Sequence, residues 1–193
     1  MLSLKCKCGA FEANFDSPPR MVFNCQCHSC VAAIQCIEAR EGFDGTSMKC
    51  DKESGGASVA IYRSANTTVV KSDKDSIGFM KVGEEGKLAR SYCNKCGTVL
   101  FNVFVPNWCA VNRNALTTSD GEAYKPEGDV MNVNCKSAFD VDKVKGPKHN
   151  MVPFRMLLKF IPLLAGFGDA SNTEESLIPE DIAKVEACPI TWE

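Results

Sequence analysis

Seven of the twelve cysteines fall into three tight clusters, at spacings that are typical of metal ligands. The clusters are Cys6-x-Cys8, Cys25-x-Cys27-x-x-Cys30 and Cys93-x-x-Cys96. Cysteines this close in sequence are poorly placed to form a disulfide with each other, but they bind one tetrahedral ion well when a turn points both sulfurs inward. The spacing therefore predicts zinc bound through thiolates, at two sites in the chain.

Glycine follows two of the clusters, in Cys6-Lys7-Cys8-Gly9 and in Tyr92-Cys93-Asn94-Lys95-Cys96-Gly97. This pattern is typical of a zinc knuckle, where turn amides stabilise the thiolates and the glycine tolerates positive φ. A single pair could instead be a redox dithiol, but no βαβ pattern surrounds it, which disfavours a thioredoxin-like site. Combining the two pairs gives four thiolates, which is the ligand set of a closed structural zinc site.

The middle cluster places three thiolates, Cys25, Cys27 and Cys30, within six residues on what we expect to be an early loop. Three thiolates occupy three corners of a tetrahedron and leave one position for water or an incoming thiol, as catalytic zinc requires. We therefore take these three cysteines as candidate catalytic residues that hold the second zinc. Zinc with three thiolates carries a net charge of about −1, so we expect this second ion to be labile.

Two histidines offer alternative ligands for the second site. His28 is the neighbour of Cys27, which makes simultaneous binding to one ion sterically awkward. His149 could supply a distant fourth ligand, which would close the site and argue against catalysis. We favour a solvated loop for His149, because it follows Pro147-Lys148.

The start of the chain lacks the apolar stretch and the cleavage site of a secretory signal, which predicts a cytoplasmic protein. Reducing cytosol disfavours disulfides, so we interpret the high cysteine count as metal binding. The cysteines outside the clusters lack close partners, and we expect them to be small apolar side chains with no assigned function. They are Cys36, Cys50, Cys109, Cys135 and Cys188.

Up to about residue 115 the chain alternates short β-branched or aromatic runs with turn residues, which predicts a mainly β fold of antiparallel strands. Loops or hairpin turns are expected at Asp51–Ala57 and Val82–Lys87. We expect Trp108 to be a core residue, with stacking on a ligand as the alternative. The predicted strands are Ala10–Phe15, Val59–Arg63, Thr68–Lys71, Phe79–Val82, Val99–Val105 and Trp108–Val111.

The remaining residues predict a C-terminal extension, so we divide the chain into a zinc-binding core, 1–118, and an extension, 119–193, packed on that core. Apolar residues at helical spacing predict a short amphipathic helix over Phe154–Leu164. One or two further helical turns are expected within Glu174–Glu186, ending before Cys188-Pro189. The basic residues of the first helix, Arg155 and Lys159, could meet an anionic substrate, although a solvated face is the favoured interpretation.

Composition and charge exclude several classes of protein. Hydrophobic residues at 45% and charged residues at 24% match a soluble globular protein. A net charge of −2 creates no basic field for phosphate backbones, so we expect no nucleic-acid partner. The most apolar region, 151–168, is interrupted by Arg155, Lys159 and two prolines, so no membrane span and no membrane partner are expected.

The order of the clusters resembles that of the glutathione-dependent formaldehyde-activating enzyme and centromere protein V-like zinc domain family. The resemblance covers about residues 1 to 115 and implies an Mss4-like, mainly β zinc-binding fold. It implies a structural zinc on Cys6, Cys8, Cys93 and Cys96, and a catalytic zinc on the trio, close to where glutathione binds. Many members carry a basic residue just after the trio, where this chain has Val31-Ala32-Ala33.

The activity that the resemblance implies is that of a carbon–sulfur lyase, with glutathione as the small-thiol partner and formaldehyde as the second substrate. Its reaction is the reversible condensation of the two to S-hydroxymethylglutathione. Two other classes of function stay open. The chain could be a non-catalytic zinc-binding interaction module, which would need no open three-thiolate site. It could also be a thiol redox or metal-buffering protein.

Overall fold

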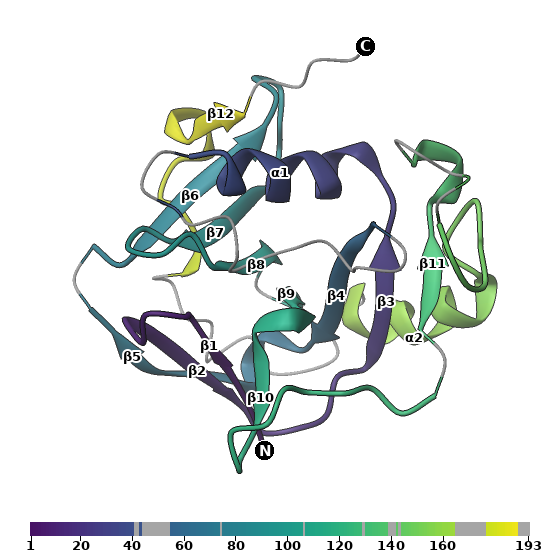
Figure 1. The fold of residues 1–193 in the computed structure, drawn as a ribbon, viewed down its shortest axis with the longest axis horizontal. Coiled ribbons are helices and arrows are strands. Elements are labelled where there is room, and N and C mark those ends of the chain that lie inside the picture. Colours follow the sequence, from purple (N-terminus) through teal and green to yellow (C-terminus); the bar gives the residue numbers. More distant parts are fainter. Residues whose placement is uncertain are drawn as a thin grey trace.

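The protein is described here from a computed structural model of residues 1–193, of which 1–40, 43, 55–73, 75–105, 107–128, 130–138, 142, 144–164 and 177–188 are placed well enough to describe. In this part of the chain the fold is mainly β, as predicted, and it contains two short α-helices (Figure 1). The helices are α1 (His28–Glu38) and α2 (Phe154–Leu164). The strands are β1 (Leu2–Lys5), β2 (Phe11–Phe15), β3 (Met21–Cys25), β4 (Ala57–Tyr62), β5 (Thr67–Ser72), β6 (Ile77–Val82), β7 (Ala89–Cys93), β8 (Val99–Phe104), β9 (Cys109–Asn112), β10 (Leu116–Thr118), β11 (Met131–Val133) and β12 (Glu186–Cys188).

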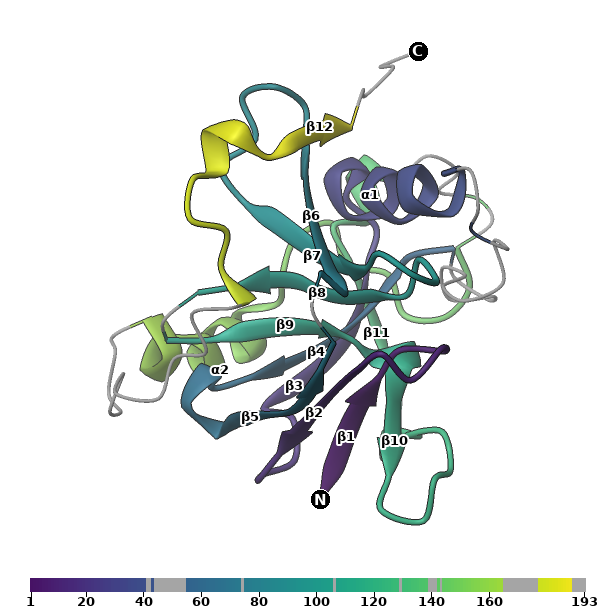
Figure 2. The same ribbon diagram turned by 90° about the vertical axis from the view of Figure 1, so that its left-hand side faces the viewer.

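The strands form two sheets. The smaller sheet has four strands in the order β10-β1-β2-β5, and the larger has eight in the order β11-β3-β4-β9-β8-β7-β6-β12. Figure 2 shows the small sheet packed below the middle of the large one, while α1 covers the other side. The middle strands of the large sheet are therefore covered on both faces.

Burial on both faces explains the sequence of the middle strands. All six residues of β4 are buried. Val59 and Ile61 face the cluster that contains Ile34 and Ile37 of α1, whereas Ala60 and Tyr62 face the small sheet. Successive side chains of a strand point to opposite faces, so a continuous apolar run is what a doubly covered strand requires.

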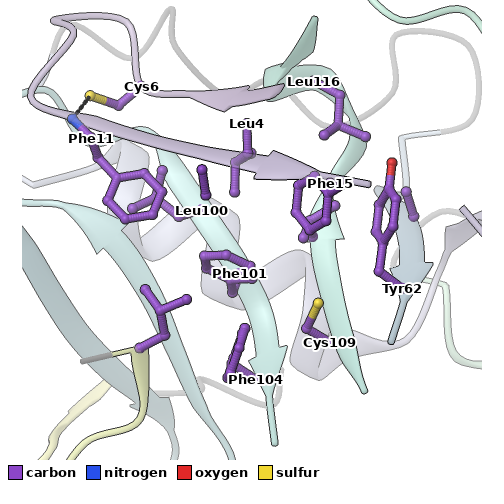
Figure 3. Packing of buried hydrophobic residues seen from close by; sticks show 14 of the residues in the cluster. Leu4, Cys6, Phe11, Phe15, Tyr62, Leu100, Phe101, Phe104, Cys109 and Leu116 are labelled. Atoms are coloured by element: carbon purple, nitrogen blue, oxygen red, sulfur yellow. Dashed lines mark hydrogen bonds between the residues drawn. The ribbon is translucent and has the colours of Figure 1, made fainter. Parts of the chain in front are cut away.

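The core between the two sheets is rich in aromatic rings (Figure 3). Phe11 of β2 meets Phe101 of β8 edge-on, with ring centroids 6.2 Å apart. Phe15 stacks on Tyr62 of β4 at 4.0 Å. Phe11 lies next to Cys6, and both contacts hold the first hairpin of the chain against the large sheet.

All six strands predicted from the sequence are present, within a few residues of their predicted bounds, and α2 has the predicted bounds. The helix α1 was not predicted; it has no acidic residue in its first turn and no side-chain cap hydrogen bond. Within the segment Glu174–Glu186, the described residues contain no α-helix; they include a 3-10 turn, Ile182–Lys184, and Glu186 begins β12. Residues 174–176, and most of the loop predicted at Asp51–Ala57, lie outside the described residues.

The strands up to β10 pair antiparallel, as predicted, whereas both edges of the large sheet are parallel. There β11 pairs with β3, and β12 pairs with β6, in parallel. Parallel neighbours need a long connection, and both of these strands come from the far C-terminal part of the chain. The division into a core, 1–118, and an extension, 119–193, stays a prediction.

Two cysteines that we expected to be free, Cys36 and Cys188, form a disulfide. The bond joins α1 to β12, across 152 residues of sequence and a Cα–Cα distance of 6.3 Å. Arg40, just after α1, also contacts Glu186 of β12 and lies over the ring of Tyr92. The pairing escaped the sequence argument because only the fold brings these segments together.

Among the described residues, no helix is long and apolar enough to cross a bilayer.

Candidate metal centres

The first centre joins two hairpins from opposite parts of the chain. Cys6 and Cys8 lie in the turn between β1 and β2, whereas Cys93 ends β7 and Cys96 lies in the turn before β8. The four sulfurs lie within 4.8 Å of one another. Zn–S bonds of about 2.3 Å in a tetrahedron place sulfurs about 3.8 Å apart, and the Cys6–Cys8 and Cys8–Cys93 sulfur distances are 3.5 and 3.6 Å. The four thiolates therefore fit one zinc ion.

Backbone groups shape both turns of this four-cysteine centre. The Phe11 amide donates to the Cys6 sulfur at 3.2 Å, as Figure 3 shows. Gly9 and Gly97 have φ of 71° and 72°, so both knuckle glycines adopt the left-handed backbone that the sequence predicted. At Gly97 a Cβ would also lie 2.7 Å from the ring of Phe43. The backbone of the two turns therefore helps to bring the four sulfurs together.

The thiol pKa values show why this centre suits a cation. Burial raises the pKa of Cys6 and of Cys93. At Cys96 burial also raises the pKa, but hydrogen bonds from Thr98 outweigh it and bring the pKa down to about 7. Four thiolates this close repel one another strongly without a cation, and a divalent ion removes that repulsion.

The second centre contains the trio Cys25, Cys27 and Cys30, whose sulfurs also lie within 4.8 Å of one another. Its placement on a loop is wrong: Cys25 ends β3, Cys27 is the N-cap of α1, and Cys30 lies in the first helical turn. A strand end and a helix start hold the ligands more rigidly than a loop would. The Cys25 and Cys27 sulfurs are 3.3 Å apart, which fits ligation of one ion.

One side of the trio is accessible. Cys25 is 5% exposed, whereas Cys27 and Cys30 are half-buried. Neither His28 nor His149 belongs to the trio's group of ligand atoms in the described part of the chain. In that part of the chain the centre therefore offers three thiolates, and a bound ion would keep one position for a further ligand.

Two polar side chains beside the trio were not predicted from the sequence. Arg90 of β7 is 5% exposed and donates from Nη2 to the Ser29 hydroxyl of α1 at 2.6 Å, and from Nη1 to the Leu88 carbonyl. Asn134 has a φ of 60° and donates from Nδ2 to the Cys25 sulfur at 3.4 Å. The sequence gives no signal for either residue, because the positions of Arg90 and Asn134 beside the trio depend on the fold.

A buried polar network supports the strand that carries Cys25. The side-chain oxygen of Asn24, Oδ1, accepts hydrogen bonds from Arg113 Nη2 at 3.1 Å and from the Ser58 hydroxyl at 3.4 Å. The side-chain oxygen of Asn132, Oδ1, accepts hydrogen bonds from the side-chain amides of Asn24 and Gln26 at 3.3 and 3.4 Å. These hydrogen bonds link β3 to β11, so the network holds the two strands together and places Asn134 at the trio.

The three thiols differ in acidity. Hydrogen bonds from Cys25 and Cys30 lower the pKa of Cys27 to about 3, and the charge of Arg90 adds to this effect. The same hydrogen bonding raises the pKa of Cys25 and, more strongly, that of Cys30, as does burial. At neutral pH the metal-free trio therefore holds one thiolate and two thiols.

This asymmetry predicts that zinc binding to the trio releases two protons at neutral pH, because all three ligands must be deprotonated in the complex. The pKa values of Cys25 and Cys30 both lie above neutrality, so the apparent zinc affinity of the trio should rise about a hundredfold per pH unit around pH 7. Zinc titrations by calorimetry in buffers of different ionisation enthalpy give the proton count. A count near zero would show that the metal-free trio is already fully ionised.

The other cysteines fall into three groups. Cys109 and Cys135 are buried and free, as expected, and burial raises the pKa of Cys109 to about 12. Cys36 and Cys188 form the disulfide described above. Cys50 lies outside the described residues.

Comparisons with known proteins add little to this picture. No family model matches the sequence, and no curated protein matches it. Among solved structures, a distant match is the crystal structure of a Rhodobacter sphaeroides protein from a structural genomics project. It is 17% identical, with a TM-score of 0.41, and the match covers 68% of this chain and 99% of that one. We draw no argument from a similarity this distant.

Proposed function

We propose that this protein is a zinc-dependent carbon–sulfur lyase that acts on a small thiol adduct, and that the adduct is S-hydroxymethylglutathione. The proposal includes an Mss4-like fold and a cytoplasmic location. The observation that carries it is the second centre: three thiolates, accessible on one side, next to a buried arginine and separate from a complete four-thiolate centre. A purely structural protein needs only the four-thiolate centre.

In the proposed condensation, the glutathione thiol loses its proton and its sulfur attacks the carbonyl carbon of formaldehyde. A C–S bond forms, the C=O π bond breaks, and the oxygen takes up a proton. The reverse reaction expels the thiolate and regenerates the aldehyde. A zinc ion on the trio would supply an open position that favours the thiolate form of the incoming thiol.

The chain's own residues supply charge and orientation. Three ligand thiolates and one substrate thiolate carry four negative charges, of which a divalent ion neutralises two. Arg90 is a buried cation beside this site, and its bond to Ser29 fixes the guanidinium at the start of α1. The N-terminus of α1 adds a partial positive charge at Cys27. Both features favour an anionic substrate, and Arg90 supplies a basic group that the segment Val31-Ala32-Ala33 lacks.

The proposal is tested by measuring exchange between formaldehyde and S-hydroxymethylglutathione with the zinc-loaded full chain. Because the two equilibrate without an enzyme, magnetisation-exchange NMR is suitable, with buffer and metal-free protein as references. We expect the loaded chain to accelerate exchange in proportion to its concentration. A chain that holds both zinc ions and leaves the rate unchanged would overturn the proposal and favour an interaction module.

Arg90→Gln is expected to lower kcat/KM about tenfold to thirtyfold, mainly through a higher KM for glutathione, because the anionic site loses its buried counter-charge. The pH at which activity is half-maximal should also rise, since the substrate thiol ionises less readily. Arg90→Lys keeps the charge and should keep most of the activity. If Arg90→Gln melts normally, binds two zinc ions and retains the native pH profile, Arg90 has no role in the reaction.

A further inference from the structure

Helix α2 is attached to the rest of the fold along one narrow edge. Met156 is 4% exposed, and Phe160 packs edge-on against Trp108 with ring centroids 5.1 Å apart. The opposite side is apolar but open to solvent. Its residues have the spacing i, i+3, i+4 and i+7 of one helix face, and they are Phe154, Leu157, Leu158 and Ile161, exposed by 70%, 46%, 49% and 50%.

In the described part of the chain, exposed large apolar residues are most concentrated at residues 151–161, the segment that contains this apolar face. Met151, just before the helix, is 75% exposed and extends the face. Elsewhere in the described residues such side chains are isolated, as are Val70 and Leu88. A contiguous apolar face of this kind marks an interaction surface, whereas isolated exposed residues need no explanation.

The segment that carries the face is cationic, although the whole chain has a net charge of −2. Residues 144–164 contain four basic residues, Lys145, Lys148, Arg155 and Lys159, and no Asp or Glu. With 3.6 residues per turn, Arg155 and Lys159 lie along one flank of α2, between the apolar face and the buried edge. Both are exposed.

A pocket of about 520 Å³ continues this cationic flank. Three basic residues from different segments line it: Arg20 before β3, Arg63 after β4, and Lys159 of α2. None of its described lining residues is acidic. An adjoining pocket shares Arg20 and Lys159 and contains one acidic residue, Glu127, beside a further cation, Lys125. The excess of converging cations fits a phosphate group, since arginine binds phosphate oxygens through paired hydrogen bonds.

We propose that α2 docks on the surface of an anionic phospholipid bilayer, a membrane partner that the sequence did not predict. The apolar face enters the boundary between headgroups and acyl chains, Arg155 and Lys159 lie at the level of the phosphates, and the pocket receives a headgroup phosphate. A helix with one apolar and one basic side binds membranes in this way without spanning them. Figures 1 and 2 show α2 lying apart from α1, so a docked protein would leave the trio at the start of α1 accessible.

A second copy of the chain is a poorer occupant of this face. A two-fold interface brings the same patch of two copies together, so the basic flank of one α2 would lie against that of the other. The segment 144–164 has no acidic residue to offset this repulsion. An anionic bilayer, in contrast, matches both the apolar face and its charge.

The test is flotation of the zinc-loaded full chain with phosphatidylcholine vesicles, with and without phosphatidylserine. We expect binding only to the anionic vesicles, and we expect it to weaken as salt increases. Arg155→Gln/Lys159→Gln should weaken binding by about fivefold for each charge removed. Phe154→Ser/Ile161→Ser should weaken it at least about tenfold, because the apolar anchor is reduced.

The matched control is Val70→Ser/Leu88→Ser, which removes two exposed apolar residues outside α2 and should bind like the native chain. All substituted positions are exposed, so each variant should melt like the native protein. A native chain that does not float with anionic vesicles would overturn the proposal. So would a control that loses as much binding as the α2 variants, or sedimentation analysis showing a dimer that Phe154→Ser/Ile161→Ser dissociates.

Discussion

Cys96→Ser is expected to abolish the cooperative folding of the N-terminal half of the chain. Cys96 belongs to the centre that connects the β1–β2 turn of the small sheet to the β7–β8 turn of the large sheet. Structural zinc contributes about 10–16 kcal/mol at neutral pH in small metal-dependent domains, whereas whole domains are stable by only about 5–15 kcal/mol. Losing one of four ligands therefore removes a free energy comparable to the total.

Thermal unfolding followed by circular dichroism, with zinc content measured on the same samples, checks this expectation. Cys135→Ala is the control, because Cys135 is a buried cysteine that belongs to neither centre. It should lose only the few kcal/mol of a small core truncation and should keep its zinc. A normal melting curve for Cys96→Ser would refute the structural role of the four-cysteine centre.

Cys27→Ser is expected to remove the proposed activity, by a factor of a hundred or more, while leaving the fold intact. The three ligands of the trio all lie within Cys25–Cys30, so this centre closes no long loop of the chain. Its loss should therefore lower the melting temperature far less than Cys96→Ser does. The exchange rate catalysed by the variant, its zinc content and its melting curve together check this expectation.

His28→Ala is the control for Cys27→Ser, because His28 is a neighbour of the trio but does not belong to its group of ligand atoms. We expect it to keep both the zinc content and the activity. Loss of the second zinc from His28→Ala would show that the histidine closes the site. Unchanged activity of Cys27→Ser would show that the reaction does not use the trio.

The sequence predicted the parts of this protein that depend on local patterns. The grouping of cysteines into four and three follows from spacing and ligand number, and the structure brings the same residues together. The doubly covered strand β4 is apolar except for Ser58, and α2 has a clear helical period. These signals are local because a strand or helix face is determined by residues a few positions apart.

The parts that were missed depend on contacts between distant segments. The edge strands β11 and β12 have only three residues each, too few for a period, and long connections bring them beside β3 and β6. The Cys36–Cys188 disulfide depends on β12 lying next to α1. Arg90 reaches Ser29 across 61 residues, and Asn134 reaches Cys25 across 109. No spacing rule predicts such pairs.

Zinc per chain, measured on gently purified protein and on the Cys27→Ser/Cys30→Ser variant, tests most directly whether the trio is an independent metal centre. The double variant removes two of its three ligands and none of the four-cysteine centre. We expect two zinc ions in the native chain and one in a variant that still folds. One zinc ion in both proteins, even after zinc is added, would contradict the second centre and the function proposed from it.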